Sequence, residues 1–175
     1  LQESDYNTKH YKTRIPIPEP SKSIKRKMIK TIGSYDHRFT NWGWKDPRTC
    51  LTISNLIEVF EEVDLIEKVN IIFVSRKSLS VARSLKKRNS LPLLQGVNLW
   101  KVYTERAINF CELSNIPTLY LSFEKILKEP VSECEKIFEF LSQPFNKNIV
   151  SDFVEKKIST NSKGEFLDLP KDIIY

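Results

Sequence analysis

The stretch Ile71-Ile-Phe-Val-Ser-Arg-Lys-Ser-Leu-Ser-Val-Ala-Arg-Ser-Leu85 decides the fold. The run Val69 to Val74, apolar except at Asn70, is typical of a strand buried on both faces, and Ser78 is a suitable N-cap for a following helix. Arg76 stands at the strand exit, and Ser84 lies within the helix. Open α/β sheets bind ligands at the carboxyl ends of their strands, where the next helix presents free N–H groups. The stretch therefore predicts a phosphate-binding site, to which an arginine adds bidentate bonds.

The rest of the chain alternates between helical and extended patterns. Apolar spacing predicts helices over 22–33 (with Gly33 as the stop), 53–60, 100–111 and 131–141, and strands over 41–45 and 118–123. This alternation predicts an α/β fold, a parallel sheet flanked by helices, in a single domain over 22–175. Residues 1–21 carry prolines at alternate positions and predict an extended arm.

The composition does not identify a binding partner, but the cysteine content bears on the cellular compartment. The net charge of +6 suits a polyanionic ligand and equally suits an ordinary charged surface. The densest basic run, Lys22 to Lys30, alternates with apolar residues and indicates a solvated helix face, so we expect no nucleic-acid partner. Three scattered cysteines predict neither a disulfide framework nor a metal site, and they favour a reducing, cytoplasmic location. No apolar run has the length of a membrane span.

Three segments, in order, resemble the family of PAPS-dependent sulfotransferases, where PAPS is 3′-phosphoadenosine 5′-phosphosulfate. Lys45-Asp-Pro47 is similar to the block with a catalytic lysine in tyrosylprotein-type and bacterial members. The Arg76-to-Ser84 spacing resembles the segment that binds the 3′-phosphate. Leu119 to Pro130, with the helix that follows, resembles the Tyr-Glu-Asp-Leu…Pro…Phe-Leu block, although Phe123 stands where the family has tyrosine.

The resemblance implies a P-loop nucleoside-triphosphatase-like sulfotransferase fold and a reaction. A sulfuryl group would pass from PAPS to an acceptor hydroxyl or amine, leaving 3′,5′-adenosine bisphosphate, with no metal. Arg76 and Ser84 would hold the 3′-phosphate, and Lys45 would act where charge develops on the bridging oxygen or sulfonate. Arg48, at a helix start, calls for an anionic partner: Asp46, a core carboxylate or the nucleotide. The remaining candidates are His37 as general base and Lys163-Gly164 as part of a loop that closes over the donor.

One family feature has no counterpart before Trp42. The 5′-phosphosulfate loop needs glycines so that backbone N–H groups converge on a phosphate, and that region holds one glycine. We therefore expect a C-terminal portion, incomplete at its N-terminus, that is an enzyme if the full-length chain supplies the loop.

Two alternatives stay open. One is a kinase-like P-loop enzyme, and the other is a non-catalytic nucleotide-binding or oligomerisation fragment of the same fold. The acceptor, whether small molecule, glycan or protein, and a homo-oligomeric state are both left unassigned.

Overall fold

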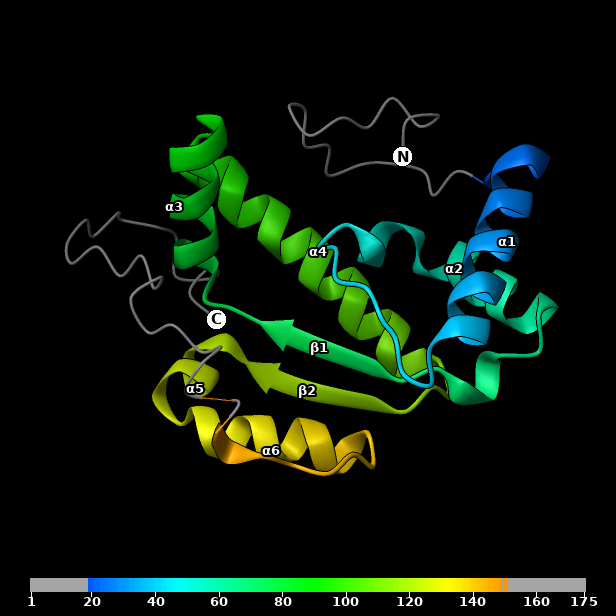
Figure 1. The fold of residues 1–175 in the computed structure, drawn as a ribbon. Helices are drawn as coiled ribbons and strands as arrows, with labels where there is room; N and C mark the ends of the chain where they lie inside the picture. The colour runs from blue at the N-terminus through cyan, green and yellow to red at the C-terminus, as the bar shows by residue number, and fades with distance from the viewer. Residues whose placement is uncertain (1–18, 149, 151–175) are drawn as a thin grey trace. The chain divides into compact units, whose positions relative to one another are not determined.

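A computed structural model describes residues 19–148 and 150. The elements in chain order are α1 (Lys22–Arg38), α2 (Thr49–Glu62), the 3-10 turn η1 (Ile66–Lys68), β1 (Ile71–Ser75), α3 (Ser78–Asn89), α4 (Leu93–Leu113), β2 (Thr118–Ser122), α5 (Phe123–Lys128) and α6 (Pro130–Phe140) (Figure 1). They fall into two compact units. The first takes in the described residues up to Ile71 together with Val102–Thr118, and the second takes in Ile72–Lys101 together with the described residues from Leu119 onward.

The first unit has a core between α1 and α2. Its buried residues are Ile32, Val59, Phe60 and Leu65, and part-buried apolar side chains from both helices and η1 pack around them. Ser21 caps α1, because its hydroxyl oxygen accepts a hydrogen bond from the Ile24 amide. The exposed ion pair Lys25–Glu62 (2.8 Å) joins the two helices and adds little to stability at such exposure.

Two local predictions for this unit are wrong. The helix α1 runs past Gly33 to Arg38. Gly33 is exposed, a Cβ there would meet nothing within 4 Å, and a helical glycine costs only about 1 kcal/mol. Residues 41–45 form no strand and connect α1 to α2 as an irregular segment.

The second unit is built on β1 and β2, which lie side by side and run parallel (Figure 1). Parallel strands need a crossover connection, which α3 and α4 supply. Ala82 of α3 is fully buried, and Gly96 of α4 approaches it so closely that an added Cβ would lie 2.9 Å from its Cα. The absence of a side chain at Gly96 thus allows α3 and α4 to meet at short range.

The predicted burial of the first strand on both faces is wrong. Along β1, part-buried and exposed residues alternate, and Ile72 and Val74 are 37% and 47% exposed. The described sheet has two strands, so the pleat turns every second side chain of β1 to an uncovered face. The coarse class is confirmed: a mixed α/β chain with a small parallel sheet flanked by helices.

The expected arm over 1–21 lies almost wholly outside the described residues. The single domain over 22–175 stays a prediction.

Candidate functional site

The backbone where β1 ends is held from two sides. We call Arg76 and Lys77 the strand-exit segment. The indole N–H of Trp100, on α4, donates a hydrogen bond to the Arg76 carbonyl at 2.8 Å. The backbone N–H of Lys77 donates to a carboxylate oxygen of Glu124, on α5, at 3.0 Å. These two bonds satisfy the carbonyl and the N–H of the peptide that joins Arg76 to Lys77. The start of α3 is therefore fixed by residues that are far away in the sequence.

The Arg76 side chain lies over an aromatic ring. Its guanidinium carbon is 4.8 Å from the centroid of Phe123, the first residue of α5. A cation over a ring face at this distance is attracted by the ring quadrupole. Phenylalanine supplies such a face as well as tyrosine does, so this contact needs no hydroxyl at position 123.

The carboxylate of Glu124 accepts hydrogen bonds from a backbone N–H and from a serine hydroxyl. Its second carboxylate oxygen accepts a hydrogen bond from the Ser122 hydroxyl at 3.2 Å, and the Ser122 oxygen also accepts from the Lys125 amide to cap α5. Within residues 19–148 the hydrogen-bond partners of Glu124 are the Lys77 amide and Ser122.

The helix α3 presents Ser84 on its more polar side. Its N-cap is Lys77 rather than the predicted Ser78, and no side chain caps the helix. Ser80 and Ser84, four residues apart, share one side of the helix and are half-buried. Ala82 and Leu85 are buried on another side. The start of α3 thus offers backbone N–H groups and hydroxyls next to Arg76, which is a suitable donor set for a phosphate.

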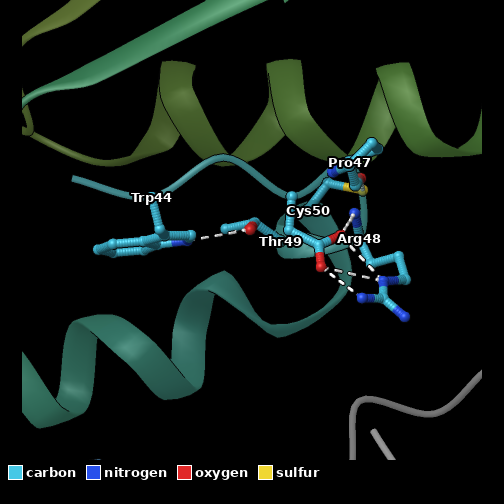
Figure 2. A network of polar contacts seen from close by, with 6 residues as sticks. Trp44, Pro47, Arg48, Thr49 and Cys50 are labelled. Atoms are coloured by element: carbon cyan, nitrogen blue, oxygen red, sulfur yellow. Dashed lines mark hydrogen bonds and ion pairs between the residues drawn. The ribbon is translucent and has the colours of Figure 1, made fainter. Parts of the chain in front are cut away.

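In the first unit, Asp46 and Arg48 form a close ion pair just before α2 (Figure 2). One carboxylate oxygen of Asp46 accepts hydrogen bonds from the Arg48 amide (2.8 Å) and from Arg48 Nε (2.9 Å), and the other accepts from the guanidinium NH₂ group. The side-chain hydrogen bonds from Arg48 are the main cause that lowers the pKa of Asp46. Of the partners we considered for Arg48, the structure therefore shows Asp46.

Lys45 and His37 are both exposed in the first unit. Lys45 lies in the irregular segment beside Asp46, and its positive charge adds to the effect of Arg48 in lowering the pKa of that carboxyl. Its side chain is exposed, so an anionic ligand can reach it. His37 lies in the last turn of α1, where a cation suits the negative end of the helix dipole.

Five rings form an aromatic cluster around the same segment: Tyr35, Phe39, Trp42, Trp44 and Phe60. Trp44 stacks on Phe60 with ring centroids 5.9 Å apart and planes 11° apart. Its indole N–H donates to the Thr49 hydroxyl at 3.2 Å, as Figure 2 shows. Trp42 is part-buried against the core, whereas Trp44 is 48% exposed.

Cys50, in the first turn of α2, is a half-buried free thiol. Its S–H donates to the Pro47 carbonyl at 3.2 Å. Burial raises its pKa to about 11. Cys50, Cys111 and Cys134 are all free, as their irregular spacing predicted.

The candidate residues are thus distributed between the two units. Lys45, Arg48 and His37 belong to the first, and Arg76 and Ser84 to the second. Lys163 and Gly164 lie outside the described residues. Nothing in the sequence indicated that Trp100 bonds to the Arg76 carbonyl. The aromatic residue at position 123 was the one sequence feature that pointed to the ring contact of Arg76.

Comparisons with known proteins add no relative. No protein-family model, curated protein or solved structure matches the chain. Among residues 19–148 and 150, no three acidic, histidine or cysteine side chains are grouped to hold a metal ion. None of the helices in that part of the chain is long and apolar enough to cross a membrane.

Proposed function

We propose that the chain is a portion of a PAPS-dependent sulfotransferase with a P-loop nucleoside-triphosphatase-like fold. The observation that carries the proposal is the strand-exit segment of β1. An arginine at the carboxyl end of a parallel strand is stacked on Phe123, and the peptide that follows it is bonded to Trp100 and Glu124. Such bracing holds an anion-binding group in place before its ligand arrives, which reduces the ordering cost of binding.

In this proposal the 3′-phosphate of the donor binds Arg76, the first-turn amides of α3 and the Ser84 hydroxyl. The uncapped start of α3 supports this role, because its free N–H groups remain available to an anion. Phosphate oxygens accept bidentate bonds from a guanidinium group, and a serine hydroxyl donates one more.

Lys45 acts in the proposal on the sulfuryl group that is transferred. The acceptor oxygen forms a bond to sulfur while the bond from sulfur to the bridging oxygen breaks, and the electron pair stays on 3′,5′-adenosine bisphosphate. The acceptor's proton passes to a base, for which His37 remains the candidate. The exposed ammonium group of Lys45 suits stabilisation of the negative charge on the oxygens of the sulfuryl group during its transfer.

Titration calorimetry of the 175-residue chain with 3′,5′-adenosine bisphosphate, with ATP as control, tests the proposal. We expect selective binding of the bisphosphate. Arg76→Ala should weaken it about tenfold to a hundredfold, because a charge-assisted hydrogen bond contributes roughly 1.5–3 kcal/mol. Arg88→Ala, which removes the same charge from the last turn of α3, should leave the affinity unchanged.

Other outcomes would assign the chain differently. Equal or tighter binding of ATP would favour a kinase-like enzyme. Binding of neither nucleotide would favour the interaction module, as would an Arg76→Ala variant with the parent's affinity. Lys45→Ala should alter bisphosphate affinity less than twofold, because the proposal places this lysine on the sulfuryl group that the bisphosphate lacks.

A further inference from the structure

The end of α3 carries an exposed serine directly after a run of cations. The last turn of the helix holds Lys86, Lys87 and Arg88, and Ser90 is its C-cap residue. We call the stretch Lys87-Arg-Asn-Ser-Leu91 the basic-serine segment. It places cations three and two residues before a serine and an apolar residue directly after it.

The backbone leaves the helix at Ser90. Its φ of 56° and ψ of 23° are left-handed, a conformation that residues other than glycine adopt mainly in turns and at helix ends. The Ser90 amide donates a hydrogen bond to the Lys86 carbonyl at 2.9 Å. Residues 90–92 form no helix and connect α3 to α4. Ser90 therefore stands between one turn of helix and a short stretch of irregular chain.

The last turn of α3 can open without taking a side chain out of the core. Leu85 is the last buried residue of the helix, and residues 86–90 are all exposed. Arg88 donates a hydrogen bond to its neighbour Asn89 at 2.9 Å, and the ion pairs found within residues 19–148 hold other side chains. A helix end with few tertiary contacts is the part of a helix that opens most readily.

This arrangement suits a protein kinase that selects basic substrates. Such a kinase binds a short extended stretch of its substrate, and carboxylates in its cleft pair with cations that precede the acceptor serine. In the basic-serine segment, Lys87 and Arg88 occupy those positions, and Leu91 offers an apolar contact after the serine. An opened last turn would present all of them together with the Ser90 hydroxyl.

We infer that Ser90 is a phosphorylation site for a serine/threonine kinase that selects basic substrates, with ATP as the donor. The Ser90 oxygen forms a bond to the γ-phosphorus while the bond from that phosphorus to the bridging oxygen breaks, so ADP leaves with the electron pair. A carboxylate of the kinase takes the hydroxyl proton. The inference does not rest on the proposed function, because the kinase acts on Ser90 whether or not the chain binds adenosine bisphosphate.

Phosphorylation changes the charge of this turn more than its structure. A phosphate group adds about two negative charges, which leaves about one of the three positive charges of the last turn uncompensated. The negative end of the helix dipole disfavours the phosphate. Lys86 and Lys87 lie four and three residues before Ser90, where side chains are neighbours on a helix, and they attract it. Because the two effects oppose each other, we expect the helix content of the chain to stay unchanged.

Three other serines of α3 also follow cations, but the helix protects them. Ser78, Ser80 and Ser84 are half-buried and precede the last buried residue of the helix. Drawing them into an extended stretch would unwind the part of α3 that packs, which includes the fully buried Ala82. We therefore expect a kinase to modify Ser90 much faster than these three serines.

The test is phosphorylation of the 175-residue chain by the catalytic subunit of cAMP-dependent protein kinase with ATP and Mg²⁺, followed by peptide mapping in a mass spectrometer. We expect phosphate on Ser90. Mapping separates it from Ser159, which follows Lys156 and Lys157 at the same spacing and lies outside the described residues. Ser90→Gly, which suits a left-handed backbone, should remove the phosphate at this position alone. A parent chain without phosphate on Ser90 would overturn the inference.

The role of the cations is tested with two double variants. Lys87→Gln/Arg88→Gln should slow phosphorylation of Ser90 about a hundredfold, because a charge-assisted hydrogen bond contributes roughly a factor of ten to affinity. Lys125→Gln/Lys128→Gln is the matched control, since it removes two exposed cations from the last turn of α5, and it should leave the rate unchanged. Equal slowing in both double variants would overturn recognition through the neighbouring cations.

The same maps give the rate at each serine of α3. Modification of Ser84 as fast as that of Ser90 would overturn the assignment of the exposed turn as the site. A kinase that selects acidic substrates, casein kinase 2, should leave Ser90 unmodified. Equal modification by both kinases would show that exposure alone selects this serine, and it would overturn the assignment to a kinase of basic specificity.

Discussion

The same substitution, glycine to alanine, should have opposite effects on stability at two helical positions. Gly33 lies on the exposed side of α1, and a Cβ there would meet nothing within 4 Å. Gly96 lies in the first turn of α4, and a Cβ there would lie 2.9 Å from Ala82 Cα and 3.0 Å from Ala82 Cβ. Ala82 has no rotamer that would relieve the contact, so α3 and α4 would have to move apart.

The magnitudes follow from two competing effects. Alanine is favoured over glycine in a helix by about 1 kcal/mol, which is the whole effect expected for Gly33→Ala. Overpacking a close contact costs about 1–3 kcal/mol. For Gly96→Ala the two effects sum to a net destabilisation of about 1 kcal/mol. The variants should therefore differ by about 2 kcal/mol, or roughly 4–8 °C in Tm for a chain of this size.

Circular dichroism during thermal unfolding measures both variants against the parent. Trp100 lies one turn beyond Gly96 and donates to the Arg76 carbonyl, so displacement of α4 should also weaken bisphosphate binding. Gly33→Ala should leave that binding unchanged. Stabilisation by both substitutions would refute the close packing of α3 and α4.

Three further outcomes are expected. Trp100→Phe keeps the ring and removes the N–H bonded to Arg76, so bisphosphate affinity should fall about threefold to tenfold in calorimetry, for the loss of roughly 1 kcal/mol of hydrogen bonding; an unchanged affinity would show that the bond does not position Arg76. Cys50 should react slowly with iodoacetamide at pH 8, because a pKa of about 11 leaves about one thiol in a thousand ionised; modification as fast as that of free cysteine, seen by mass spectrometry, would contradict its burial. Because Arg48 lowers the pKa of Asp46 below 3.8, their pair stabilises the folded chain above that pH and loses its effect as pH falls through the lowered value. Asp46→Asn should therefore destabilise the chain in urea at pH 7 and much less at about pH 2, and an equal loss at both values would count against the ion pair.

Local signals predicted most elements but not their ends. The stretch from Ile71 to Leu85 forms the strand and helix expected of it, because β-branched residues give way there to residues suited to a helix. Glycine often follows a helix end, which predicts a stop at Gly33. Whether a glycine ends a helix depends on the residues beyond it, and here the helix continues to Arg38.

Burial was harder to predict, because it depends on partners outside each element. In α2, the apolar spacing ran through Ile53, Leu56, Ile57 and Phe60. Phe60 is buried and Ile57 packs against the core, but the other buried residues are Leu51, Val59 and the polar Asn55. The helix carries two overlapping apolar stripes, and the packing of the unit selects between them. In the same way, the exposure of every second residue of β1 follows from the number of strands described beside it.

In the candidate site, too, the local features were predictable from the sequence and the tertiary contacts were not. The positions of Arg76 and Ser84 at a strand exit and in the following helix are local, so the sequence predicted them. The contacts that hold the strand-exit segment join residues 24 and 47 positions apart. No periodicity links residues at such separations, and only tertiary packing reveals that Trp100 and Glu124 belong to the site.

The bracing of the strand-exit segment limits how far this phosphate-binding element can be transplanted. A designer who copied residues 71–85 onto another scaffold would transfer Arg76 and Ser84 but not the indole and carboxylate that fix the peptide between strand and helix. Without these contacts the grafted segment would be flexible, and the entropy cost of ordering it would lower its affinity for phosphate. A portable version has to include the Trp100 part of α4 and the Phe123-Glu124 start of α5 as well, so the smallest transferable module joins pieces of four elements.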